Sequence, residues 1–162
     1  MVRSSDLAPM SLVGGLLLLA IFLLGMPAGA QTFNMEDARV QMAPLDGLMR
    51  FHPGDDPRWA EPGLDDSSWA LVASSKNWRG QGYGNLSGFG WYRFTVVLPR
   101  ERRQQLGLYV PPIRTSYQVF ADGKLVGSFG GFPPDGTIRE LHQHLVLLPQ
   151  SQTGRMAIAI RV

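Results

Sequence analysis

The sequence predicts an all-β domain, folded as a sandwich or jelly roll. No stretch after residue 31 keeps a 3.6-residue apolar period for three turns, whereas several short runs alternate apolar and polar residues with period two. The chain contains 19 glycines and 12 prolines, many of which separate these runs. Short alternating runs separated by turn residues are typical of antiparallel strands, of which we expect about eight. The only helix expected is a turn or two near residues 57–60.

The expected strands differ in how clearly the side chains alternate. In residues 91–98 every second side chain is apolar, and Arg93 and Thr95 fall on the opposite face. Residues 142–148 are more continuously apolar, which favours a strand buried on both faces. The eight predicted strands are residues 47–52, 69–73, 91–98, 106–110, 117–121, 124–127, 142–148 and 156–162.

Residues 117–127 carry the strongest local signal, that of a β-hairpin. Two alternating runs meet there across Asp122-Gly123. This pair favours a type I′ turn, because both central residues of that turn need a positive φ. The register of the two strands should therefore be fixed by the turn.

The N-terminal residues 1–30 are predicted to be a signal peptide. Arg3 precedes a 17-residue apolar run, and Ala28-Gly29-Ala30 supplies a small-residue cleavage pattern. The run is at the short limit for spanning a bilayer, so we expect export to a periplasmic or extracytoplasmic location rather than a permanent anchor. Residues 31–45 are expected to form a loose arm, and residues 46–162 the sandwich. Because the chain stops inside an alternating strand, we expect it to be truncated at its C-terminus.

Composition and motifs argue against several classes of function. The net charge is only +2, and no basic block is longer than Arg102-Arg103, which argues against nucleic acid as a partner. The absence of cysteine excludes disulfides, thiolate metal sites and a cysteine nucleophile. Ser87 does not lie in a G-x-S-x-G elbow. With no catalytic constellation present, we expect the chain by itself not to be an enzyme.

Two acidic pairs and two histidines are the candidates for metal chemistry. Asp55-Asp56 and Asp65-Asp66 lie beside Pro, Gly or Ser, which favours turn and capping roles. A structural calcium ion, held by loop carbonyls and one of these carboxylates, remains an open alternative. His142 and His144 would share a strand face, but a surface or rim role is favoured over a zinc or copper site. No catalytic residue, metal ligand or resident cofactor is assigned.

The most unusual local composition is that of residues 77–91. This segment combines five glycines with four aromatic residues and with Arg79 and Asn85. Glycines allow a ligand to approach the backbone, and aromatic faces with amide and guanidinium donors suit a sugar ring. Alternatively, the aromatic side chains plug one end of the sandwich. The candidate ligand contacts are Trp78, Arg79, Tyr83, Asn85 and, beside a strand, Arg114.

Several motifs together resemble the galactose-binding-like jelly roll. Residues 51–60 (FHPGDDPRWA) and 64–69 (LDDSSW) resemble the opening of such domains, as do residues 90–93 (GWYR). The hairpin of residues 117–127 is similar to the family pattern V-x-x-[ND]-G-x-x-[IV]-G. The resemblance covers residues 47–162 and implies a jelly-roll fold. It also implies structural roles for Trp69 and the hairpin turn.

Proteins of two kinds carry this domain, and the resemblance to each implies a different function. One kind is the exported sensor region of bacterial membrane serine phosphatases and histidine kinases, to which residues 51–123 are more similar. This resemblance implies a sensory module for signal transduction, whose partner is a carbohydrate-like ligand or a neighbouring protein domain. Membrane contact would come only through sequence after Val162 or an uncleaved signal.

The other kind is the β-galactosidase or β-glucuronidase type of glycoside hydrolase. Resemblance to it implies an accessory sugar-binding domain. In both cases any phosphatase, kinase or glycosidase activity would lie outside residues 1–162. A third possibility is a surface for packing or dimerisation without a small ligand.

Overall fold

The computed structural model describes residues 32–34, 44–98, 105–113, 116–132, 134, 136, 142–151 and 153–162. The predicted signal peptide, most of the arm and Arg114 lie outside these residues. The described part contains nine strands and two short 3₁₀ helices. Neither of these two helices is long and apolar enough to cross a membrane. The elements are β1 (Thr32–Asn34), β2 (Leu48–Pro53), η1 (Pro57–Ala60), β3 (Ala70–Ala73), η2 (Arg79–Gln81), β4 (Gly90–Val97), β5 (Gly107–Val110), β6 (Tyr117–Ala121), β7 (Lys124–Phe129), β8 (His144–Leu147) and β9 (Arg155–Arg161).

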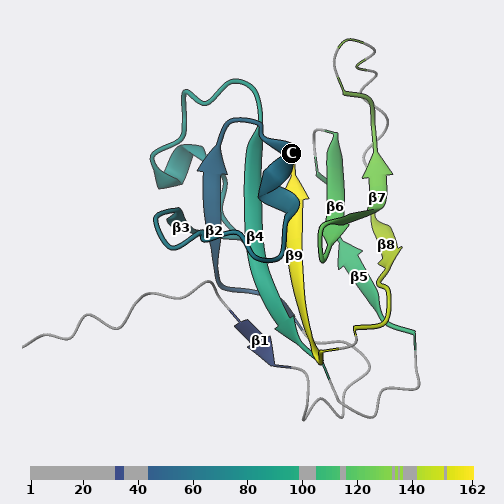
Figure 1. Cartoon of the computed structure of the whole chain (residues 1–162). Coiled ribbons are helices and arrows are strands. Elements are labelled where there is room, and N and C mark those ends of the chain that lie inside the picture. Colours follow the sequence, from purple (N-terminus) through teal and green to yellow (C-terminus); the bar gives the residue numbers. More distant parts are fainter. Residues whose placement is uncertain are drawn as a thin grey trace, which may run out of the picture.

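The strands form two sheets, as Figure 1 shows. The larger has the order β3-β2-β4-β9-β6-β7, and the smaller pairs β5 with β8. All pairings are antiparallel except that of β1, which runs parallel to β4 with Thr32 opposite Thr95. Each of the eight predicted strands is present and the all-β fold is confirmed. The additional strand, β1, comes from the segment expected to be a loose arm.

A first hydrophobic core fills the space between the two sheets. The large sheet supplies buried side chains such as Phe94, Val119 and Ile158, and the small sheet supplies Leu108 and Val146. Because neighbouring side chains on a strand point to opposite faces, the period-two pattern seen in the sequence places these residues together. This packing makes the molecule a sandwich.

The other face of the large sheet is covered by residues 54–69, which contain η1. Trp69 and Ala60 of this segment pack with Trp91 of β4 and Ala159 of β9 in a second buried cluster. In Figure 1 the segment lies in front of β4 and β9. As a result β4 is buried on both faces, and Arg93 is only 4% exposed.

The prediction that residues 142–148 are buried on both faces is wrong. Val146 is buried, but Leu145 and Leu147 are 65% and 62% exposed. The strand β8 belongs to the two-stranded outer sheet, so only one of its faces meets the core. Tyr109, opposite Leu145 on β5, is also exposed.

The predicted hairpin is confirmed, together with the conformation of its turn. Asp122 and Gly123 have φ of 47° and 80°, as a type I′ turn requires. Asp122 also ties the turn to β9, since its carboxylate accepts a 2.8 Å hydrogen bond from the Ala157 amide. The turn therefore fixes both the hairpin and its attachment to the sheet.

Substitution of Gly123 by alanine should lower the free energy of unfolding by about 1 kcal/mol, because an L side chain is strained at this φ. Urea unfolding would measure the loss. Gly63→Ala is the matched control, since Gly63 does not adopt a positive φ and a Cβ there meets nothing within 4 Å. Equal stability of the two variants would contradict the assignment of the turn.

Candidate functional site

The loop between β3 and β4 is fastened to the end of β3 by Gln81. The Gln81 side-chain oxygen accepts a 2.6 Å hydrogen bond from the Ala73 amide. Its nitrogen donates to the carbonyls of Ala73 and Lys76, at 3.1 and 3.0 Å. A second contact comes from Asn77, whose side-chain oxygen accepts a 2.9 Å hydrogen bond from the amide of Gly80 in η2. The loop that carries the predicted ligand contacts is thus held at defined points.

Aromatic rings from this loop pack on Phe51 of β2, which is fully buried. The rings of Trp78 and Tyr83 lie 5.4 and 4.8 Å from that of Phe51, centroid to centroid, and Tyr92 of β4 lies 4.9 Å away. The Trp78 indole donates a 2.5 Å hydrogen bond to the Tyr92 hydroxyl. Burial raises the pKa of that hydroxyl, and the hydrogen bond from Trp78 opposes the rise. Trp78 therefore has its one polar group engaged inside the protein.

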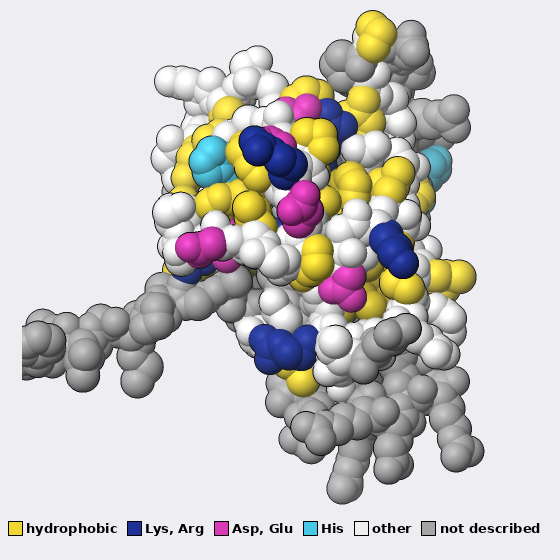
Figure 2. Space-filling model, viewed as in Figure 1, with side chains coloured by type: hydrophobic (Ala, Val, Ile, Leu, Met, Phe, Trp, Pro, Cys, Tyr) yellow, Lys and Arg dark blue, Asp and Glu magenta, His cyan; other side chains and the backbone are white. Residues whose placement is uncertain are grey.

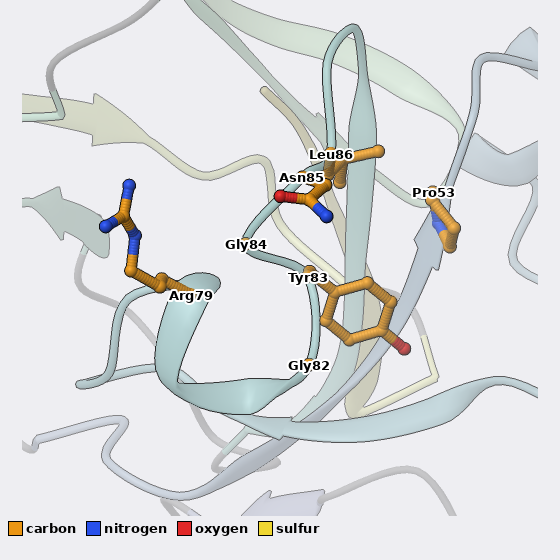
Figure 3. A pocket seen from close by; sticks show the side chains of 7 residues that line it. All are labelled: Pro53, Arg79, Gly82, Tyr83, Gly84, Asn85 and Leu86. Atoms are coloured by element: carbon orange, nitrogen blue, oxygen red, sulfur yellow. The ribbon is translucent and has the colours of Figure 1, made fainter.

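Beside these rings lies an open hollow of about 360 Å³, shown in Figure 3. Three of the five predicted contact residues, Arg79, Tyr83 and Asn85, line it, whereas Trp78 does not. In Figure 3 the Tyr83 ring is directed toward the side of β2, and Arg79 extends to the other side of the turn, with Asn85 between them. The complete lining is Pro53, Arg79, Gly82, Tyr83, Gly84, Asn85 and Leu86.

The polar groups that line the hollow are available to a ligand. Three polar groups belong to the residues that line it: the Arg79 guanidinium, the Asn85 amide and the Tyr83 hydroxyl. None of them forms a hydrogen bond or an ion pair with a residue that the structure describes. The hollow thus offers one cation, one amide, one hydroxyl and an apolar ring, and its lining contains no acidic side chain. This combination can bind a polyhydroxylated ring through its apolar face and its hydroxyl rim.

Pro53 and Leu86 were not predicted to line the hollow. Leu86 belongs to the loop that the composition singled out, and Pro53 ends β2 on the neighbouring side. Their only sequence signal is nearness to a glycine-rich turn or a strand end. Such a signal does not say which face of the loop closes against the sheet.

Asp56 and Asp65 have the predicted turn and capping roles, whereas Asp55 and Asp66 form ion pairs with distant arginines. Asp56 accepts from the backbone amide of Arg58 at the start of η1 and pairs with its guanidinium at 2.6 Å. Asp65 accepts from the Ser67 amide at 3.0 Å, and Asp66 pairs with Arg93 at 2.9 Å. In each pair the two carboxylates have different partners, so neither pair acts as one site.

Asp55 belongs to a clamp at the end of β9. Its carboxylate accepts hydrogen bonds from Arg161 at 2.7 and 2.5 Å and from the Trp91 indole at 3.2 Å. The bond from Arg161 lowers the pKa of Asp55 below its ordinary value. Arg161 also lies 4.2 Å from the centre of the Phe89 ring, which it faces. This clamp attaches the start of the segment 54–69 to the sheet.

In the described ranges no group of three histidine or acidic side chains lies close enough to hold a metal ion. His52 packs against Trp59 and Trp69 on the large sheet, at 4.6 and 5.2 Å. His144 lies on the small sheet, where its Nδ1 is 2.7 Å from the Tyr117 hydroxyl. The two imidazoles therefore do not converge. A calcium ion at the acidic loops stays a prediction.

The face that carries residues 54–69 is electrostatically mixed. Figure 2 shows acidic and basic side chains scattered among hydrophobic ones, without a broad patch of either sign. Asp55 and Asp56, at the start of this segment, are each paired with an arginine. The face has no continuous basic stripe of the kind that follows a phosphate backbone.

We expect the free energy of unfolding to depend on pH in the alkaline range, through the hydroxyl of Tyr117. Burial raises the pKa of its hydroxyl to about 12, above the ordinary value of 10.0. A raised pKa means that the unfolded chain loses this proton first, so the stabilisation is present below pH 10 and is lost as the pH rises toward 12. Unfolding midpoints measured between pH 8 and 12 should fall less steeply in Tyr117→Phe than in the wild type. Equal slopes would show that Tyr117 does not carry the effect.

No family model and no curated protein matches this sequence. Solved structures do match its fold. A β-glucuronidase of Bacteroides uniformis aligns with 74% of the chain at a TM-score of 0.61 and 22% identity. A β-glucuronidase of Bifidobacterium dentium aligns with 74% at 0.57 and 22%, and a glycosyl hydrolase family 2 member of Bacteroides cellulosilyticus with 73% at 0.56 and 18%.

The chain spans only 14%, 19% and 17% of the lengths of those three proteins. The likeness therefore concerns one β-sandwich domain of much longer chains. At these identities it shows the fold, which agrees with the predicted jelly-roll class. By their names, these three proteins are glycoside hydrolases.

Proposed function

We propose that this chain is a carbohydrate-binding β-sandwich module that serves a glycoside hydrolase and performs no catalysis itself. The observation that carries the proposal is the fold likeness to β-glucuronidases, of whose chains a domain of this size is a small part. The hollow beside Tyr83 supplies a suitable binding surface. Its ring could support the apolar face of a sugar, and Asn85 and Arg79 could bind the hydroxyl rim.

The proposal also includes export by the predicted signal peptide. The exported module could then bind extracytoplasmic glycans. Mass spectrometry of the secreted protein should find Gln31 as the first residue. Retention of residues 1–30 in the product would contradict cleavage and leave the module tethered.

Binding can be tested by titration calorimetry of the full chain with methyl β-D-glucoside, methyl β-D-galactoside and methyl β-D-glucuronide. We expect saturable binding of at least one of them. Tyr83→Ala should weaken it by about tenfold, which corresponds to about 1.4 kcal/mol. Tyr109→Ala is the matched control, since Tyr109 is an exposed tyrosine of β5 and does not line the hollow.

The outcomes of this titration are distinct. Loss of binding in Tyr83→Ala with retention in Tyr109→Ala supports the hollow as the site. Equal affinity in both variants would place the sugar elsewhere. Binding of none of the three sugars would overturn the proposed carbohydrate-binding role and favour the sensory alternative.

The genomic reading frame after Val162 separates the same alternatives by other means. An extension of several hundred residues with a carboxylate pair at glycosidase spacing supports the accessory domain. Several apolar segments of about twenty residues would instead indicate a membrane signalling protein. The second result would contradict the proposal.

A further inference from the structure

We propose that the hollow selects acidic saccharides, whose carboxylate or sulfate group binds the guanidinium of Arg79. This inference rests on the proposed carbohydrate-binding function and names its ligand class. It is carried by the charge of the lining and by the absence of any counter-ion to Arg79 among the described residues.

The charge of the hollow comes from Arg79 alone. No other lining residue is charged. Three of the other described arginines are used differently: Arg58, Arg93 and Arg161 each pair with an aspartate at 2.9 Å or less. A guanidinium left free beside a concave surface has two parallel N–H groups to offer, and these fit a carboxylate better than a neutral hydroxyl.

The stem of Arg79 passes close to Gly84 in the turn of the loop. Its Cγ lies so near Gly84 that a Cβ there would come within 3.3 Å of it. Gly84 therefore permits the close passage of this side chain.

The other groups of the hollow fit the remainder of such a ligand. The Tyr83 ring is fixed edge-on against Phe51, at an interplanar angle of 69°, and gives a rigid apolar surface. The Asn85 amide, exposed and without a partner in the described part of the chain, can donate to or accept from ring hydroxyls. A sugar acid presents these same features: an apolar C–H face, hydroxyls and one anionic group.

The test compares ligands that differ only at the sixth carbon. Methyl β-D-glucuronide carries a carboxylate there, methyl 6-O-sulfo-β-D-glucoside a sulfate, and methyl β-D-glucoside a hydroxymethyl group. At low ionic strength we expect the two anions to bind the full chain about tenfold more tightly than the neutral sugar. The preference should shrink as salt is added, because the site is open to solvent. Tighter binding of the carboxylate than of the sulfate would identify a uronic acid.

Two variants assign the preference to Arg79. Arg79→Gln should bind all three sugars with the affinity of the neutral one. Lys76→Gln removes the same charge from the same loop, from an exposed residue that does not line the hollow, and should keep the preference. Loss of the preference in both variants would show that net charge, and not Arg79, is responsible.

The remaining outcomes separate this inference from the proposed function. If the neutral sugar binds as tightly as both anions, selection of acidic saccharides is wrong and carbohydrate binding stands. If none of the three binds, the proposed function fails, and this inference fails with it.

Discussion

Substitution of Asp66 by alanine is expected to lower the free energy of unfolding by about 3 kcal/mol. Asp66 is the carboxylate partner of Arg93, whose side chain is only 5% exposed on β4. The remaining hydrogen bond of that guanidinium goes to the Trp59 carbonyl, which carries no net charge. The variant would therefore leave a buried cation without a counter-ion. Chemical denaturation followed by tryptophan fluorescence would measure the loss.

Two further variants separate the ion pair from general effects of charge. Glu61→Ala changes the net charge equally, but Glu61 is exposed, so its stability should stay close to that of the wild type. The double variant Arg93→Met/Asp66→Leu removes both charges and should recover much of the loss, since a buried ion pair can be replaced by apolar groups. A loss in Asp66→Ala no larger than that in Glu61→Ala would contradict the role of the pair.

The strands of this fold could be predicted because their signals are local. Alternation along residues 91–98 correctly places Phe94 and Val96 on the face that meets the first core, and Arg93 on the opposite face. Alternation does not say what covers each face, however. In β4 the polar face is covered by residues 54–69, whereas in β8 one face of an apolar strand remains exposed. Both outcomes depend on segments far away in the sequence.

The candidate site was predictable to a similar extent. Glycine and aromatic density identified the loop, and Arg79, Tyr83 and Asn85 line its hollow. Composition could not distinguish the roles of Tyr83 and Trp78. That distinction depends on the Tyr92 hydroxyl, which engages the Trp78 indole from a neighbouring strand. Arg114 lies outside the described residues.

Phe51 links the stability of the sandwich to the shape of the hollow. Its ring is fully buried and contacts Trp78 and Tyr83 of the loop and Tyr92 of β4. Phe51→Ala should lower the free energy of unfolding by about 4 kcal/mol, because the three rings cannot close the cavity that it leaves. Urea denaturation would measure this loss.

Phe51→Leu keeps most of the volume and should cost less than about 1.5 kcal/mol. It removes the flat ring against which Tyr83 is held, so it should still weaken sugar binding while the fold is retained. If Phe51→Leu binds sugar like the wild type, the position of Tyr83 does not depend on Phe51. If Phe51→Ala is no less stable than Phe51→Leu, the surrounding aromatic rings can repack into the space of the lost ring. Phe51 then does not fix the position of the loop. The predicted order, with Phe51→Ala unstable and Phe51→Leu stable but weakly binding, follows from one ring that both fills the end of the sandwich and supports a wall of the hollow.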